Sequence, residues 1–154
     1  MGTKYKMTDE TTEVNGQTLH RIEALIDIPL TNVKAGDKGG FIESEENLSQ
    51  EGDCWVGGNA KVSDNAQVFG NAHVSDNARV SGNAQVFGDA WVQEDSVVSG
   101  SAKVSGSAKV SGNAWVTDNA VVSGNAHVHG NAWVTDNAQV YDKAEVYEIG
   151  RAHV

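Results

Sequence analysis

The chain has 154 residues, enough for one compact domain, and a formal net charge of −10 at pH 7. That acidic balance argues against binding a nucleic-acid backbone, because such binding needs clustered Lys and Arg. The single cysteine excludes an internal disulfide. No apolar stretch is long enough to span a membrane, and the N-terminus lacks the apolar core of a signal peptide. We therefore expect a cytoplasmic protein without nucleic-acid or membrane partners.

Residues 4–28 predict a β-hairpin. The sequence Val14-Asn15-Gly16-Gln17 is a strong two-residue turn signal, since both central positions tolerate the positive φ that such turns require. Apolar residues that we expect to pack inward follow the turn: Leu19, Ile22, Leu25, Ile26 and Ile28.

A six-residue repeat dominates the rest of the chain. Valine recurs at every sixth position from Val56 to Val146, which makes sixteen repeats. A small residue lies two positions before each Val; it is Ala in every repeat except those with Cys54 and Ser96. Residues two apart on a strand face the same side, and the Gly, Asp and Asn that follow favour turns. The period therefore predicts short strands with an inward small residue and Val, joined by turns.

Three such repeats close one coil. The sequence NAQVFG at 65–70 recurs at 83–88, and NAWVTDNA at 113–120 recurs at 131–138, so both shifts equal three hexapeptides. Stacked triangular coils would pair as parallel strands at a spacing of about 4.8 Å. The fold class predicted for residues 54–146 is an all-β, single-stranded parallel β-helix.

The two ends differ from this shaft. An open β-helix end exposes strand edges that favour aggregation, so we expect the hairpin and residues 39–48, within an N-terminal segment 1–53, to cap the first coil. At the other end Tyr147, Ile149 and Val154 do not continue the six-residue step. We therefore expect 147–154 to form a short C-terminal tail.

The pattern V-x-G/D-N-A-x resembles the hexapeptide repeat of left-handed β-helix proteins, a family that includes acyltransferases and γ-class carbonic anhydrases. The resemblance covers residues 54–146 and implies a left-handed coil and a side-by-side homotrimer. The segment 35–56, AGDKGGFIESEENLSQEGDCWV, is similar to the segment that precedes the repeats in bacterial and phage-borne hexapeptide proteins labelled as transferases. Such a label follows the fold, which is a weak guide to function.

Outward positions repeat every three hexapeptides and form rows along the shaft. The rows are Trp55, His73, Trp91, Lys109, His127 and Glu145; Lys61, Arg79, Val97, Trp115 and Trp133; and Phe69, Phe87, Ser105, Ser123 and Tyr141. Stacking is predicted for Trp115 over Trp133 and for Phe69 over Phe87. Such ladders can stiffen a β-solenoid, but aromatic strips facing water also indicate a contact surface. We take as candidate interface residues Trp55, Phe69, Phe87, Trp91, Val97, Trp115 and Trp133.

Catalytic signals are weak. His127 and His129 flank Val128, so both project outward and could act as a base. By resemblance, acyltransferases of this fold also use a loop that leaves the shaft, and no insertion interrupts residues 54–146. His73 lies three coils from His127, so we predict no metal site. Cys54 occupies an inward position and is expected to be a buried structural thiol.

These observations favour a non-catalytic scaffold or binding module that forms homo-oligomers and presents its aromatic rows to a protein partner, without a cofactor. One alternative is an acyltransferase that uses acetyl-CoA at a subunit interface. Another is an acidic phage-encoded inhibitor or decoy that binds a host factor. The absence of an inserted loop in residues 54–146 favours the scaffold over the acyltransferase.

Overall fold

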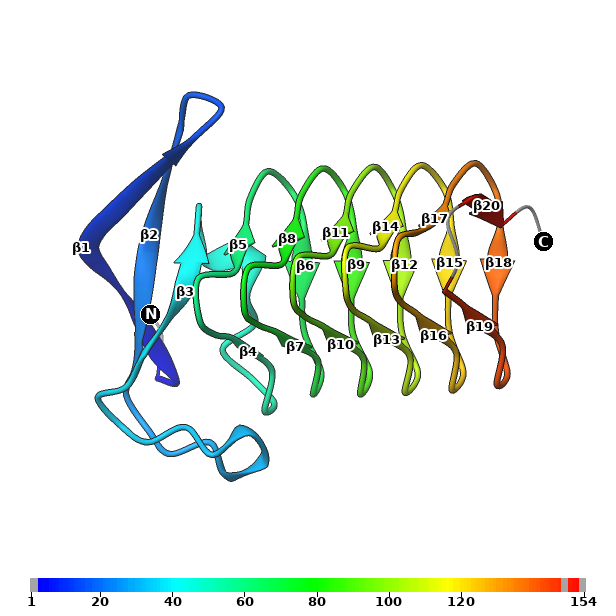
Figure 1. Cartoon of the computed structure of the whole chain (residues 1–154). Helices are drawn as coiled ribbons and strands as arrows, with labels where there is room; N and C mark the ends of the chain where they lie inside the picture. The colour runs from blue at the N-terminus through cyan, green and yellow to red at the C-terminus, as the bar shows by residue number, and fades with distance from the viewer. Residues whose placement is uncertain (1–2, 148–149, 153–154) are drawn as a thin grey trace.

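The computed structural model describes residues 3–147 and 150–152. It shows an all-β chain, a three-sided parallel β-solenoid with an antiparallel hairpin at its N-terminal end (Figure 1). The long axis of the shaft is perpendicular to the strands, and each side of the shaft is one sheet. This architecture confirms the predicted fold class. No helix in the described part of the chain is long and apolar enough to cross a membrane.

Three sheets make the three sides. The first sheet contains, in spatial order, β1 (Tyr5–Val14), β2 (Gln17–Ala24), β3 (Lys38–Ile42), β5 (Lys61–Val62), β8 (Arg79–Val80), β11 (Val97–Val98), β14 (Trp115–Val116), β17 (Ala132–Val134) and β20 (Gly150–Ala152). The second sheet contains β4 (Trp55–Val56), β7 (His73–Val74), β10 (Trp91–Val92), β13 (Lys109–Val110), β16 (His127–Val128) and β19 (Glu145–Val146). The third sheet contains β6 (Gln67–Val68), β9 (Gln85–Val86), β12 (Lys103–Val104), β15 (Val121–Val122) and β18 (Gln139–Val140).

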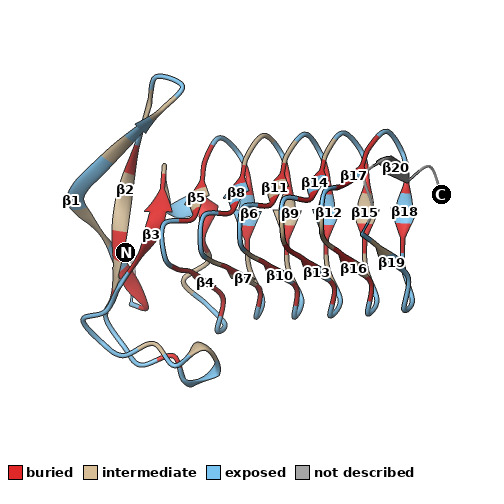
Figure 2. Cartoon of the chain, in the orientation of Figure 1, coloured by how far each residue is buried: buried red, intermediate tan, exposed pale blue. Residues whose placement is uncertain are grey.

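The core is a column of small aliphatic side chains along the axis. Figure 2 shows that buried residues recur in each coil of the shaft. Every repeat Val from Val56 to Val134 is fully buried, Val140 is almost fully buried, and Val146 is half-buried at the end of the column. The predicted inward orientation is therefore confirmed. Burying one Val side chain is worth about 1.5–3 kcal/mol, so the column is the main source of stability for the shaft.

The hairpin is also confirmed. Asn15 and Gly16 have φ of 50° and 81°, the geometry of a two-residue turn that joins β1 to β2. Ile22 is fully buried, but Leu25 is 41% and Ile26 is 49% exposed. The expectation that these two residues pack inward is wrong, because they follow the end of β2 and lie in the segment that leads to the short 3-10 helix η1 (Pro29–Thr31).

The solenoid begins before residue 54. Strand β3 pairs in parallel with β5, placing Ile42 beside Val62, and Leu48 forms a bridge with Val68 after the short 3-10 helix η2 (Glu45–Asn47). Both Ile42 and Leu48 are fully buried in the column. Residues 39–48 therefore form part of a first coil and do more than cap it. Ile42 and Leu48 take the place of the repeat Val, but each lies twenty residues before its partner, whereas later coils pair at a spacing of eighteen. Two extra residues before Cys54 cause this difference, so the six-residue period does not reveal Ile42 and Leu48.

The register also continues beyond Val146. Strand β20 pairs in parallel with β17, with Gly150 beside Ala132 and Ala152 beside Val134. The expectation that the six-residue step ends at Val146 is wrong, because the step continues through Gly150 and Ala152 with no Val to mark it. Two residues named in that expectation, Ile149 and Val154, lie outside the described residues.

Candidate functional site: the outer face of the first sheet

One row of outward side chains runs the length of the first sheet. Paired residues in neighbouring coils are, in order, Phe41, Lys61, Arg79, Val97, Trp115 and Trp133. Each lies immediately before an inward residue, so the alternation of the strand directs it away from the axis. The row combines one phenyl ring, two cations, one small apolar residue and two indoles. From Lys61 onward it follows the order that the repeat predicts.

The two indoles stack. The ring centroids of Trp115 and Trp133 are 5.5 Å apart, their planes are 15° from parallel, and each side chain is 44% exposed. Phe69 and Phe87 stack on the third sheet with centroids 4.9 Å apart, and both are half-buried. Both predicted ladders are confirmed. The Trp pair presents more apolar surface to water, so it is the stronger candidate for a contact.

The cationic half of the row lies next to the hairpin. The Arg21 guanidinium lies 4.3 Å from the centre of the Phe41 ring and pairs with Glu10 at 2.8 Å. Within the described residues neither Lys61 nor Arg79 forms an ion pair. Burial lowers the pKa of Lys61, and the charges of Arg79 and Arg21 lower it further. Three cationic side chains, Arg21, Lys61 and Arg79, therefore lie near one another on this part of an acidic protein.

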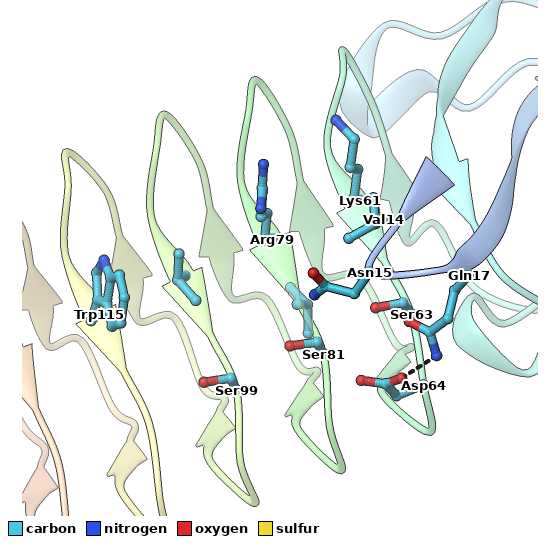
Figure 3. A pocket seen from close by; sticks show the side chains of 12 residues that line it. Val14, Asn15, Gln17, Lys61, Ser63, Asp64, Arg79, Ser81, Ser99 and Trp115 are labelled. Atoms are coloured by element: carbon cyan, nitrogen blue, oxygen red, sulfur yellow. Dashed lines mark hydrogen bonds between the residues drawn. The ribbon is translucent and has the colours of Figure 1, made fainter. Parts of the chain in front are cut away.

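The hairpin turn overhangs this part of the row and encloses a pocket of about 270 Å³ (Figure 3). The turn contributes Val14, Asn15 and Gln17, and the shaft contributes Lys61, Ser63, Asp64, Arg79, Val80, Ser81, Val97, Ser99 and Trp115. The Gln17 amide donates a hydrogen bond to Asp64 Oδ1 at 2.6 Å, which fixes the turn against the shaft. The three serines form a hydroxyl row beside the cations.

Sequence reasoning missed this pocket. It places Lys61, Arg79, Val97 and Trp115 in one row and predicts the hairpin turn at Asn15 and Gly16. The direction in which the hairpin leans depends on tertiary contacts, such as the hydrogen bond from the Arg21 guanidinium to the carbonyl of Gly39. No local pattern specifies that direction.

The second sheet requires one correction. Trp55 was expected on the surface, but it is only 2% exposed and makes an edge-on contact with Tyr5 at 6.5 Å. Its side chain points outward from the coil, yet the N-terminal segment covers it, so it is not an interface residue. Trp91 is 36% exposed and edge-on to His73 at 5.0 Å.

The two candidate bases lie farther along the same sheet. His127 and His129 project outward with ring centroids 4.3 Å apart. Ser111 Oγ lies 3.3 Å from His127 Nε2, and Glu145 Oε2 lies 3.6 Å from His129 Nε2. Burial lowers the pKa of His127, and the neighbouring His129 adds to this. Among the described residues, no group of three or more His, Cys, Asp or Glu side chains is placed to hold a metal ion.

Cys54 is fully buried at the first coil, as predicted for a structural thiol. Burial raises the pKa of its thiol, and the nearby Lys4 ammonium opposes this shift. A thiol with a raised pKa is mostly protonated near neutral pH, and the protonated form is a poor nucleophile.

Comparison with known proteins identifies a repeat family that the shaft resembles. Four stretches of the shaft, residues 66–82, 72–86, 84–100 and 108–124, match the family model described as the YdcK beta solenoid repeat. The repeats are thus similar to that repeat family, in agreement with the solenoid. The match gives no support to the resemblance to transferases. No curated protein matches the chain.

Proposed function

We propose that this chain is a non-catalytic β-solenoid scaffold that associates with further copies of itself through the outer face of the first sheet. The observation that carries the proposal is the Trp115–Trp133 stack, in which both side chains remain 44% exposed. Large aromatic side chains facing water on a flat surface are typical of a protein contact, where Trp is enriched. The straight sides of the shaft suit packing of one copy beside another.

The distance between the candidate bases and the pocket under the hairpin turn favours a scaffold over an enzyme. A transferase must hold its donor and acceptor within reach of a base. His127 and His129 project from the second sheet, whereas the pocket under the hairpin turn lies on the first. Among the described residues, Asp64 is the one acid that lines this pocket, and its carboxylate accepts hydrogen bonds from Gln17 and from the backbone N–H of Gly82.

One observation favours the acyltransferase as a second candidate. A hollow of about 460 Å³ beside His127 is lined by Lys109, Lys143 and Glu145. The lysines could attract the phosphates of acetyl-CoA, and Glu145 also lies near His129. Saturable binding of acetyl-CoA in calorimetry, abolished by His127→Ala, would support this candidate over the scaffold. The third reading, an acidic decoy for a host factor, rests on the net charge alone.

The proposal is tested by the mass of the full chain in solution. We expect light scattering to give a multiple of the 16.3 kDa chain mass, with a trimer as the assembly that the left-handed β-helix resemblance implies. The double variant Trp115→Ser/Trp133→Ser should shift toward monomer. Trp91→Ser, which removes an exposed indole from the second sheet, should leave the mass unchanged. A monomeric wild type, or an unchanged mass in the double variant, would contradict the proposal.

A further inference from the structure

We propose that the pocket beneath the hairpin turn binds a small anion that carries a planar aromatic ring. The proposal concerns a second kind of contact on the first sheet. It goes beyond self-association, because its ligand is a small molecule. Trp115 belongs to both proposed contacts, so the variants that test the ligand site leave Trp115 in place.

The site is a gap in the ladder of the first sheet. Val97 lies between Arg79 and Trp115 in the paired register. Trp133 covers one face of the Trp115 ring, and the small side chain of Val97 leaves room against the other. Two coil spacings separate Arg79 from Trp115, or about 10 Å. A flat ring resting on Val97 would therefore lie roughly 5 Å from each neighbour, a normal distance for stacked rings and for a cation over a ring.

The fold already builds ladders at this spacing. The ring centroids are 4.9 Å apart in the Phe69–Phe87 pair and 5.5 Å apart in the Trp115–Trp133 pair. The Arg21 guanidinium also lies over Phe41 at the start of the same row. A bound ring would thus extend the Trp ladder by one step toward Arg79, at the spacing that the coils impose.

The charge of the pocket selects an anion. Lys61 and Arg79 are adjacent in the register and, among the described residues, have no ion-pair partner. Among the described lining residues the one carboxylate is that of Asp64, which accepts two hydrogen bonds. A carboxylate or phosphate on the ligand would be attracted by the two cations and would relieve the repulsion between them. The neighbouring serine hydroxyls can add further hydrogen bonds.

The size of the pocket restricts the ligand further. Its volume of about 270 Å³ lies just below the usual range of roughly 300–1,000 Å³ for small-molecule sites. The hairpin turn closes one side and is fixed by the hydrogen bond between Gln17 and Asp64. The space therefore suits one or two fused rings with a single charged group.

Calorimetry on the full chain with four probes tests the proposal. We expect saturable binding of 2-naphthoate, and at least tenfold weaker binding of neutral 2-naphthamide and of the non-aromatic cyclohexanecarboxylate. 2-Naphthyl phosphate serves as the phosphate arm, and its binding relative to 2-naphthoate identifies the preferred anionic group. Equal binding of 2-naphthoate and cyclohexanecarboxylate, or no saturable binding of either aromatic anion at millimolar concentration, would overturn the proposal.

Two variants locate the site. Val97→Phe should fill the gap and reduce the affinity for 2-naphthoate at least tenfold, whereas Val121→Phe, the same change at an outward position between Lys103 and Gln139, should not. Arg79→Gln should also reduce the affinity about tenfold, and it keeps the test valid if Val97→Phe fails to fold. Unchanged affinity in a folded Val97→Phe or in Arg79→Gln would contradict the site. Neither outcome bears on the mass measured for the Trp115→Ser/Trp133→Ser variant.

Discussion

The ammonium group of Lys4 lies 2.7 Å from the carbonyl oxygen of Cys54 and 3.2 Å from its Sγ atom. It also donates a hydrogen bond to the carbonyl of Gly52 at 3.3 Å, and the Lys4 residue is only 1% exposed. A buried ammonium is tolerated where polar atoms satisfy it. Lys4 therefore satisfies carbonyl groups of the turn that leads into Cys54 and joins the N-terminal segment to the first coil.

Replacing Lys4 tests this role. Lys4→Met keeps most of the apolar length of the side chain but leaves buried carbonyls without their donor, which costs about 1–3 kcal/mol. We expect the midpoint of urea unfolding to fall accordingly. Lys6→Met changes an exposed residue of β1, two positions along the chain, and should have little effect. Superimposable unfolding curves for the two variants would show that Lys4 contributes no net stability.

The inward small position should resist enlargement. Ala102 is fully buried, and the adjacent Lys103 is exposed. Ala102→Leu should overpack the column and reduce the free energy of unfolding by about 1–3 kcal/mol, whereas Lys103→Leu should change it little. Equal losses in a denaturant series would contradict the inward and outward assignment.

Gly39 and Gly40, at the start of the solenoid, should also resist replacement by a larger residue. A Cβ atom on Gly40 would lie 2.5 Å from the carbonyl oxygen of Ala60 and 2.8 Å from Val56 Cγ1. Gly40→Ala should therefore force the backbone of β3 away from the next coil and lower the thermal midpoint. The control is Gly57→Ala, where the nearest atom would be Trp55 Cδ1 at 3.4 Å. Similar melting temperatures for both variants would argue against the close approach.

Acidification should destabilise the protein through His73. Burial lowers the pKa of this imidazole, and Asp76 opposes the shift; neither ring nitrogen has a hydrogen-bond partner in the described structure. The unfolded chain takes up a proton near pH 6.5, whereas the folded chain does so only at lower pH. The stability present above about pH 6.5 is thus lost as the pH falls through the folded pKa.

Chemical unfolding between pH 7 and pH 5 checks this expectation. His73→Gln should reduce the amount by which the free energy of unfolding falls between pH 7 and pH 5. Part of that fall should remain, because burial also lowers the pKa of His127. A variant whose stability falls as steeply as that of the wild type would exclude His73 as a cause.

The regular six-residue repeat explains how much of the fold could be predicted from the sequence. Interactions between neighbouring coils repeat with the period of the chain, so the spacing of the valines predicts the inward column. The same spacing places Trp115 beside Trp133. Where the spacing changes, prediction fails: two extra residues before Cys54 conceal that Ile42 and Leu48 belong to the column, and Ala152 continues a register in which no Val marks the position.

The candidate site was predicted only in part, for a different reason. Its row of residues follows from the period, but the pocket exists because the hairpin leans over that row. The same N-terminal segment buries Trp55, which the period alone places on the surface. Both features depend on contacts between segments that are unrelated in sequence, such as the hydrogen bond between Gln17 and Asp64.

The paired register makes the pocket sensitive to the number of coils between the hairpin and the first indole. Arg79, Val97 and Trp115 are eighteen residues apart in sequence, so loss of one whole coil would bring Trp115 directly beside Arg79 and close the gap. Gain of one coil would carry the indole beyond the hairpin turn. Loss of a single hexapeptide would rotate every later side chain by a third of a turn and move both indoles to another side of the shaft. Relatives that conserve this site would therefore hold the segment up to Trp133 constant in length and vary only beyond it.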